Sequence, residues 1–204
     1  GKIYLLFGSA NSIGKNLYGA DVIWTGEFLN DSTIFRAHSA NINGDNTDDI
    51  IIGVPNNSET NASAGSIYLA LGSMNPNGGN ISTLTKWTGE SINDHAGLYL
   101  DSGDINGDGK YEILVGVPEK YNIKKEKNVG TVYLIHGSTN PSGGSLSESN
   151  AKWFGTSNNQ FGRGCSLKGD VNNDGNKDIA MIAPYYGTKN INSGIIFIYH
   201  GLGF

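Results

Sequence analysis

Short apolar runs alternate with turn residues along the whole chain, and they predict strands. Each run is rich in β-branched and aromatic residues and is bounded by glycine, asparagine or proline. No segment shows a convincing helical period. In the middle of the chain the pattern predicts strands near residues 97–103, 112–117, 130–136 and 150–155. Runs such as 113–115 are apolar at every position, which is typical of a sheet that is buried on both faces.

The pattern returns with a period near 64 residues. Four glycine-led strands carry an aromatic residue three positions after the glycine: Tyr4, Tyr68, Tyr133 and Phe197. The tryptophans, each followed after one residue by glycine, recur 63 and 66 residues apart: Trp24, Trp87 and Trp153. One proline closes an apolar strand in each period: Pro55, Pro118 and Pro184. The chain is therefore a repeat protein with four predicted strands in each period.

A four-stranded sheet that is apolar on both faces cannot bury both of them alone. Successive sheets stacked around an axis bury each other's faces, and this arrangement is the β-propeller. We therefore predict an all-β fold, a β-propeller built from four-stranded antiparallel blades. Propellers close with about four to eight blades, whereas 204 residues supply only about three at this period. The ring is predicted to be incomplete in this chain.

An acidic loop precedes one apolar strand in each repeat. The loops are 41–49, 104–112 and 170–178, and their first positions are separated by 63 and 66 residues. Oxygen-bearing side chains stand at positions 1, 3, 5 and 9, and position 7 needs to supply only a main-chain carbonyl. The predicted metal ligands are therefore Asn41, Asn43, Asp45, Thr47, Asp49, Asp104, Asn106, Asp108, Lys110, Glu112, Asp170, Asn172, Asp174, Asn176 and Asp178.

Oxygen donors in this arrangement suit Ca²⁺. We predict up to three Ca²⁺ ions, one for each acidic loop. The first site is predicted to be the weakest, because Asn41 is neutral where the other loops begin with aspartate. EF-hand and dockerin loops open similarly, but they place a bidentate acid at position 12 and continue into a helix. Here position 12 is apolar and strand-forming residues follow: Ile52, Val115 and Met181.

These features resemble the FG-GAP repeats of integrin alpha-subunit propellers and of their prokaryotic relatives. The resemblance covers essentially the whole chain. The family pattern is a Phe-Gly pair, an acidic calcium loop, an apolar strand that ends in Gly-Ala-Pro, and then a Gly-x-x-Tyr strand. The strand ends of this chain keep the pattern with one substitution each: Gly53-Val-Pro55, Gly116-Val-Pro118 and Ile182-Ala-Pro184. The Phe-Gly pair is literal at Phe161-Gly162 and partial at Ala96-Gly97, and the first repeat has no clear counterpart.

The resemblance also implies a division of the chain, because in this family the acidic loop joins the innermost strand of a blade to the second. Residues 1–204 are then a single propeller segment. Residues 1–32 end a preceding blade, 33–90 and 96–156 form two blades, and 161–204 form a partial blade. The remaining blades are expected from the same longer chain or from other subunits, and we favour a fragment of a longer propeller.

Composition excludes several classes of protein. The chain has a net charge of -5, so its charge does not indicate a nucleic-acid binder. No run approaches the roughly 20 apolar residues of a membrane helix, and no membrane span is predicted in this segment. The single cysteine, Cys165, excludes a disulfide within the chain and is expected to be a small buried residue.

We predict that the chain is not an enzyme, with no catalytic residues. A catalytic site needs a nucleophile, a base or an open metal position beside its partners, and the sequence indicates none. His136 and His200 occupy a repeat position that Phe7 and Leu71 also hold, so they are expected to pack at strand ends. Lys168-Gly169-Asp170 looks like an adhesive tripeptide, but Asp170 is already a predicted ligand of the third loop.

The calcium affinity expected of the acidic loops indicates the location of the protein. Extracellular calcium modules bind with Kd on the order of 0.1–1 mM, and such sites are largely empty in cytosol. We therefore predict an extracellular or cell-surface location. Four Asn-x-Ser sequons are compatible with it but occur by chance in an asparagine-rich chain: Asn30, Asn56, Asn61 and Asn80.

The predicted function is that of a calcium-stabilised extracellular propeller, a scaffold for adhesion or protein interaction. The alternative is a glycan-binding or enzyme-associated propeller whose activity lies in a missing part of the protein. A protein or glycan ligand is expected on the variable loops opposite the metal loops, because rigid scaffolds display function on such loops. These loops are 56–64, 119–129 and 185–193.

Overall fold

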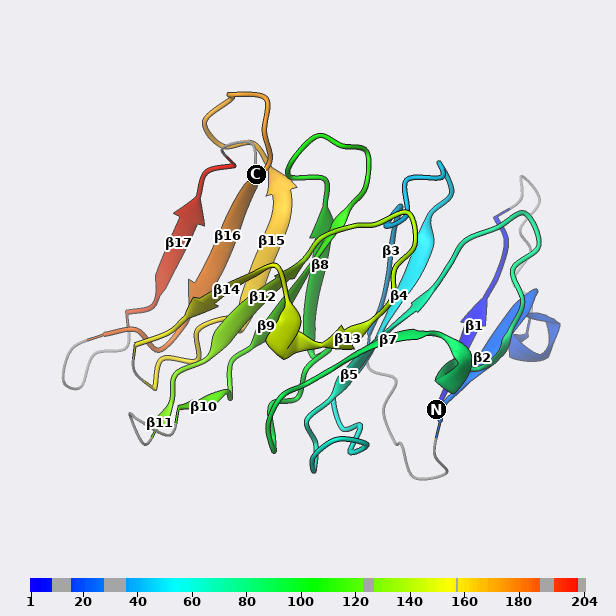
Figure 1. Ribbon diagram of the computed structural model, residues 1–204, viewed down its shortest axis with the longest axis horizontal. Coiled ribbons are helices and arrows are strands. Elements are labelled where there is room, and N and C mark those ends of the chain that lie inside the picture. Colours follow the sequence, from blue (N-terminus) through cyan, green and yellow to red (C-terminus); the bar gives the residue numbers. More distant parts are fainter. Residues whose placement is uncertain (9–15, 28–35, 123–126, 157, 188–192, 202–204) are drawn as a thin grey trace.

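The computed structural model confirms the all-β class (Figure 1). It describes residues 1–8, 16–27, 36–122, 127–156, 158–187 and 193–201. Within these ranges the only helical elements are three short 3₁₀ turns: η1 (Leu17–Gly19), η2 (Ile81–Thr83) and η3 (Leu146–Glu148). Four sheets stand side by side in chain order, and they do not close a ring over the described residues. The chain is thus an incomplete propeller, as predicted.

The two middle sheets each contain the four antiparallel strands that the repeat predicts. The second sheet is formed by β3 (Arg36–Ala40), β4 (Asp49–Val54), β5 (Ser66–Ala70) and β7 (Thr85–Thr88). The third sheet is formed by β8 (Tyr99–Gly103), β9 (Glu112–Val117), β12 (Thr131–Ile135) and β14 (Ala151–Phe154). The four strands expected in the middle of the chain are those of the third sheet.

The outer sheets have fewer strands. The first contains β1 (Lys2–Leu5) and β2 (Val22–Thr25), and the fourth contains β15 (Gly164–Gly169), β16 (Asp178–Ala183) and β17 (Ile195–Tyr199). A two-stranded hairpin, β10 (Tyr121–Asn122) and β11 (Lys127–Asn128), extends the loop after β9. The sequence pattern did not predict this hairpin, because its residues are polar and have no alternating period.

Two short strands connect neighbouring sheets and were also not predicted. β6 (Gly79–Asn80) pairs in parallel with β2 of the preceding sheet, and β13 (Gly144–Ser145) pairs in the same way with β7. Each follows a glycine-rich turn after the third strand of its own repeat. Both segments therefore reach back to the fourth strand of the sheet before, which fixes the spacing between sheets.

Hydrophobic cores fill the spaces between successive sheets, so that both faces of the middle sheets are buried. Ile51 packs into the core shared by the second and third sheets, whereas the adjacent Ile52 packs into the core shared by the first and second. Ile113 and Leu114 divide between two cores in the same way. The continuous apolar runs therefore have the two-sided burial that they predict.

Glycines allow neighbouring sheets to approach each other at the strand ends that precede the prolines. A methyl group at Gly53 would lie 2.0 Å from the carbonyl oxygen of Gly97, and one at Gly116 would lie 2.0 Å from that of Gly162. Both contacts join equivalent positions of successive repeats. The glycine of each Gly-x-Pro strand end thus packs against the glycine at the Phe-Gly position of the next repeat.

Candidate metal loops

The three acidic loops lie at the same end of the sheets, along the upper edge in Figure 1. Each joins the first strand of its sheet to the second: β3 to β4, β8 to β9 and β15 to β16. The antiparallel pairing of these strands fixes both ends of every loop. The repeat in sequence is therefore also a repeat in position.

The backbone of the three loops follows the same path. Positions 4 and 6 have positive φ in every loop: Gly44, Asn46, Gly107, Gly109, Asn173 and Gly175. Only glycine and, at a small cost, asparagine adopt this conformation readily. The glycines and asparagines between the predicted ligands are thus required by the turn itself.

The side chains at positions 3 and 5 make the same hydrogen bonds in all three loops. In the second loop, Asn106 Oδ1 accepts from the N–H of Asp108 at 3.0 Å, and Asp108 Oδ1 accepts from the N–H of Lys110 at 2.8 Å. The equivalent bonds are 3.0 and 2.8 Å in the first loop and 3.1 and 2.8 Å in the third. These bonds orient the two side chains and leave oxygen lone pairs unused.

Hydrogen bonding also favours the ionised form of the acid at position 5. The side-chain amide of Asn43 and the N–H of Thr47 lower the pKa of Asp45. The N–H groups at position 7 have the main lowering effect on the pKa of Asp108 and of Asp174. A deprotonated carboxylate is the form that binds a cation.

The acid at position 9 has a second role that the sequence did not reveal. Asp49 and Glu112 are fully buried, and Asp178 is nearly so. Asp49 Oδ2 accepts from the N–H of Ile42 at 2.8 Å, while its Oδ1 accepts from the N–H of Gly72 at 2.8 Å. Asp178 makes the equivalent bonds to Val171 and Gly201. The carboxylate therefore ties the start of the loop to the end of the third strand.

Glycine is required at that strand end because the backbone of the loop passes close to it. A methyl group at Gly72 would lie 2.2 Å from the carbonyl oxygen of Asp48, and one at Gly201 would lie 2.2 Å from that of Lys177. At Gly137 the contact is looser, since a methyl group would lie 2.8 Å from the carbonyl oxygens of Ile42 and Tyr111. The recurrence of this glycine every 64 or 65 residues was the signal in the sequence.

Glu112 differs from the other two acids at position 9. Its Oε2 accepts from the N–H of Ile105 at 2.9 Å, while its buried Oε1 has only a weak contact with the N–H of Gly137, the counterpart of Gly72 and Gly201. Burial, together with the charges of Asp108 and Asp104, raises the pKa of Glu112 to about 7. Burial also raises the pKa of Asp49. A buried carboxylate oxygen with so weak a hydrogen bond is a candidate ligand for a cation.

The structure corrects one expectation about the histidines. His200 does not pack as an apolar strand end: it is exposed, and its Nδ1 lies 3.2 Å from Asp178 Oδ1. Together with the N–H groups of Val171 and Gly201, it lowers the pKa of Asp178. The third loop therefore has a neighbour with a titratable ring, which the first loop lacks because Leu71 stands there.

The predicted ligands lie together in each loop, but their acids do not form a compact metal cluster. Over the part of the chain that the structure describes, no three Asp, Glu, His or Cys side chains group as they would around an ion. The side chains point instead to N–H groups of their own loop. The described residues also include no helix with the length and apolar character of a membrane span.

The chain is similar to known repeat proteins. The FG-GAP repeat family matches it at residues 36–69 and 100–135, which span the first three strands of the two middle sheets. Integrin alpha-PS2 of Drosophila melanogaster is 29% identical over 173 residues, which are 80% of this chain and 11% of that protein. Chicken (Gallus gallus) integrin alpha-V is 31% identical over 162 residues, 78% of this chain and 14% of that protein.

A further relative, integrin alpha-IIb of Mus musculus, is 34% identical over 119 residues, which are 56% of this chain and 11% of that protein. The chain thus spans 11 to 14% of the length of these three relatives. Both matched FG-GAP segments contain an acidic loop, 41–49 or 104–112, and the glycine-led strand that follows it.

Proposed function

This chain carries FG-GAP repeats and is homologous to integrin alpha subunits, and from this premise we propose that it is a calcium-stabilised propeller module that acts in adhesion or protein interaction. Its place would be the cell surface or the extracellular space. The observation that carries the proposal is the threefold recurrence of one hydrogen-bonded, oxygen-rich loop at the same end of successive sheets. Recurrence in geometry as well as sequence makes three chance turns a poor explanation.

In this proposal each loop binds one Ca²⁺ through positions 1, 3, 5, 7 and 9. For the second loop the ligands are Asp104, Asn106, Asp108, the carbonyl of Lys110, and Glu112. Glu112 Oε1, which is buried and only weakly hydrogen-bonded, is the proposed ligand atom of this residue. The same positions serve in the first and third loops, and the first binds most weakly because it has Asn41 in place of an aspartate.

The role of the ion is structural. Without it, the carboxylates of one loop repel each other and the buried acid at position 9 carries an unbalanced charge. A bound ion stabilises the folded state by mass action, because the unfolded loop has no preformed site. Since the position 9 acid also ties the loop to the third strand, the ion would fix three strands of its sheet at once.

The chain is proposed to be one segment of a larger propeller, in which 33–90 and 96–156 are complete blades. Further blades from the same protein, or from another subunit, would cover the last sheet, where Ile196 and Ile198 are at least half exposed. Ligands of the complete protein would bind the variable loops at the end opposite the acidic loops. No catalytic role is proposed.

Surface labelling tests the proposed location. Intact cells that express the full-length protein are treated with a membrane-impermeant biotin reagent, and the propeller is then captured and identified by mass spectrometry. The proposal predicts biotinylated lysines in this segment before lysis. Labelling that occurs only after lysis would exclude a surface location. A catalytic domain in the full-length product would favour the alternative of an enzyme-associated propeller.

A further inference from the structure

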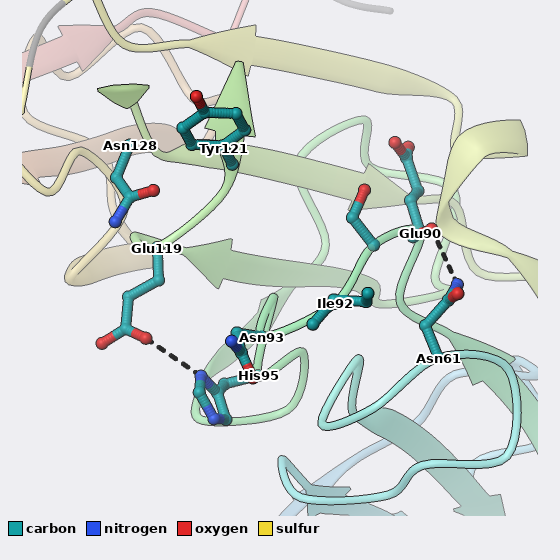
Figure 2. Close-up of a pocket in the computed structure, with 9 residues that line it drawn as sticks. Asn61, Glu90, Ile92, Asn93, His95, Glu119, Tyr121 and Asn128 are labelled. Carbon is teal, nitrogen blue, oxygen red and sulfur yellow. Dashed lines mark hydrogen bonds and ion pairs between the residues drawn. The ribbon is translucent and has the colours of Figure 1, made fainter. Parts of the chain in front are cut away.

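A pocket lies between the second and third sheets, at the end opposite the acidic loops (Figure 2). Its volume of about 820 Å³ is within the range of roughly 300–1,000 Å³ that is common for ligand sites. Three loops form it: the loop after β4, the loop between β7 and β8, and the loop that carries the β10–β11 hairpin. The residues that line it include Asn61, Asn93, His95, Glu119, Tyr121 and Asn128.

The middle loop of the pocket is held in an unusual conformation. Asn93 and His95 have positive φ values of 59° and 52°. Between them, Asp94 is almost fully buried, and its carboxylate accepts hydrogen bonds from the N–H groups of Glu90 and Ser91. Gln160 has the same φ of 52° at the equivalent position of the next repeat, so the repeat itself imposes this conformation. The loop therefore presents Asn93 and His95 in a fixed position.

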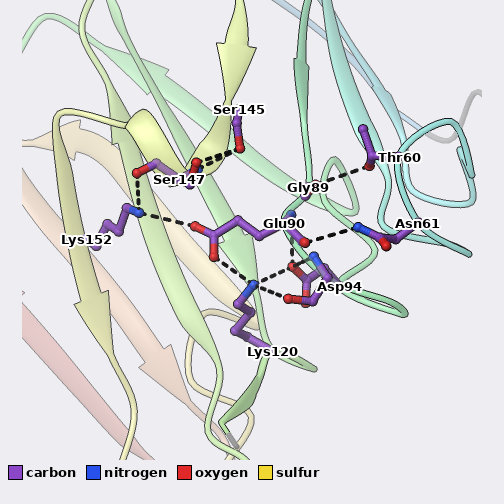
Figure 3. Close-up of polar contacts among 10 residues, drawn as sticks. Thr60, Asn61, Gly89, Glu90, Asp94, Lys120, Ser145, Ser147 and Lys152 are labelled. Carbon is purple, nitrogen blue, oxygen red and sulfur yellow. Dashed lines mark hydrogen bonds and ion pairs between the residues drawn. The ribbon is translucent and has the colours of Figure 1, made fainter.

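A network of two carboxylates and two ammonium groups holds this loop in place (Figure 3). Lys120 Nζ lies 2.8 Å from Asp94 Oδ2 and 2.9 Å from Glu90 Oε2, and Lys152 Nζ lies 3.2 Å from Glu90 Oε1. Two carboxylates and two ammonium groups thus balance in charge, although Asp94 Oδ1 is buried and makes no hydrogen bond among the described residues. None of these charges is left over to attract an ion into the pocket.

One more carboxylate lies on the rim of the pocket. His95 Nδ1 lies 3.0 Å from Glu119 Oε2, and this contact joins the loop between β7 and β8 to the loop after β9 (Figure 2). A histidine balances a carboxylate only when it is protonated, so Glu119 leaves the rim acidic and disfavours an anionic ligand. The hydrogen-bonding groups of the pocket then decide between a neutral and a cationic ligand.

Several neutral polar groups of the pocket have no partner. Within the described residues, the side-chain amides of Asn93 and Asn128 and the hydroxyl of Tyr121 make no hydrogen bond, whereas Asn61 Nδ2 donates to Glu90 O at 3.2 Å. The Tyr121 side chain is 47% exposed. Each amide offers one acceptor and two donors, and the tyrosine adds a flat apolar ring with a polar tip.

We propose that this pocket binds a short neutral carbohydrate. Sugar hydroxyl groups both donate and accept, so they match the free amides of Asn93 and Asn128 and the Glu119–His95 pair. The carbon face of a sugar ring packs on an aromatic ring such as Tyr121. The inference rests on the part of the proposed function that puts ligands on the loops opposite the acidic loops, and it names their chemical class.

The test is a titration of the ¹⁵N-labelled chain with neutral disaccharides, namely cellobiose, maltose, lactose, mannobiose and chitobiose, in buffer with Ca²⁺. The expected result is that at least one sugar gives saturable amide shifts confined to residues near 61, 90–95, 119–121 and 128. An arginine-containing tetrapeptide is titrated in parallel. Shifts at these residues from the peptide alone would assign the pocket to a peptide and overturn the proposal, as would no saturable shift from any probe.

Three variants locate the binding site. Tyr121→Ala removes the ring, and Glu119→Gln removes the acceptor charge at constant shape. Asn93→Gly removes the amide while glycine keeps the positive φ without strain, so that the loop still folds. Each is expected to lower the affinity at least tenfold. Tyr18→Ala is the matched control, because Tyr18 is 97% exposed and distant in sequence; equal affinities in all four variants would contradict the proposal.

Failure here is separable from failure of the proposed function. Melting of the same samples with and without a chelator reports on the acidic loops alone. Sugar binding without a calcium-dependent melting temperature would overturn the proposed metal role and leave the pocket in place. A calcium-dependent melting temperature without sugar binding would do the reverse.

Discussion

Tyr68 of the second sheet donates a 2.5 Å hydrogen bond to Glu27, which follows the last strand of the first sheet. Glu90 takes the same place one repeat later: it follows the last strand of the second sheet and forms a hydrogen bond with Tyr133 of the third sheet. Lys152 of the third sheet also forms an ion pair with Glu90 (Figure 3). Burial, with the neighbouring carboxylates, raises the pKa of the Tyr133 hydroxyl. A glutamate three residues after tryptophan therefore joins the first sheet to the second and the second to the third, whereas the third sheet has Thr156 at this position.

Asp94→Ala is expected to destabilise the fold strongly. The substitution leaves Lys120, which is 8% exposed, without one of its two carboxylates, and it removes the acceptor of two loop N–H groups. Breaking a buried ion pair costs about 3–5 kcal/mol. Urea unfolding of the two proteins measures the difference in free energy of unfolding.

The control for this prediction is the pair of Lys86 with Glu59, whose carboxylate is 40% exposed. Exposed pairs contribute about 0–1 kcal/mol, so Glu59→Ala is expected to stay within that range. Equal losses for Asp94→Ala and Glu59→Ala would show that burial of the network has no energetic importance.

Gly72→Ala is expected to destabilise the second sheet and to weaken calcium binding at the first loop. The added methyl group would lie 2.2 Å from the carbonyl oxygen of Asp48. It would therefore displace the N–H of residue 72, which donates a hydrogen bond to Asp49. Forced overpacking of this kind costs about 1–3 kcal/mol. Thermal melting with and without Ca²⁺ measures both effects. Gly8→Ala, which meets no atom within 4 Å, should be neutral, and a similar loss there would refute the explanation.

The period of the chain predicted the fold because each repeat must bury two faces with the same strands. Ile51 and Ile52 sit side by side in sequence and in different cores, and their apolar run indicated this directly. The strands β6 and β13 could not be predicted, because their pairing depends on the distance between two sheets. The β10–β11 hairpin is polar, so no hydrophobic period marks it.

Glu112→Gln is expected to have opposite effects with and without calcium. In the calcium-free protein the pKa of Glu112 is about 7, above its ordinary value of 4.5. The folded state then holds the proton more tightly than the unfolded state, so its stability falls as pH rises from about 4.5 to about 7. Glutamine has no charge to bury, and at pH 8 it should stabilise the calcium-free chain by on the order of 1–3 kcal/mol.

With Ca²⁺ present, the same substitution removes a charged ligand and should reduce the calcium-induced rise in melting temperature. Differential scanning fluorimetry at pH 5 and pH 8, with chelator or with excess Ca²⁺, gives all four values. Glu148→Gln, an exposed site in η3, should change none of them. Destabilisation of the calcium-free protein at pH 8 would mean that the charge of Glu112 is already satisfied within the chain.

Position and residue type predicted which side chains meet in each acidic loop, because positions 3, 5 and 7 fold together in any tight turn of this kind. The second role of Asp49, as an acceptor for Gly72, was not predictable, because the two residues belong to different strands. The contact between His200 and Asp178 was missed for a related reason. A strand-end position that is apolar in other repeats gave no sign of a polar partner.

Asn41→Asp is expected to raise the calcium affinity of the first loop several-fold. The substitution adds a carboxylate where the second and third loops already have one, and ligand charge is a main determinant of calcium affinity. Calorimetric titration of the variant and the natural chain measures the change. Asp48→Asn alters a charge within the loop but not at a ligand position, and should change the affinity by less than twofold. An equal effect from both would indicate general charge, not ligation.

The central claim is that the acidic loops bind calcium and thereby stabilise the sheets. The most direct measurement is calorimetric titration of the chelator-treated chain with Ca²⁺, beside the variants Asp45→Ala, Asp108→Ala and Asp174→Ala. We predict up to three bound ions in the natural chain, and the loss of one ion in each variant whose loop is occupied. Absence of binding heat at millimolar Ca²⁺, or an unchanged stoichiometry in all three variants, would contradict the account.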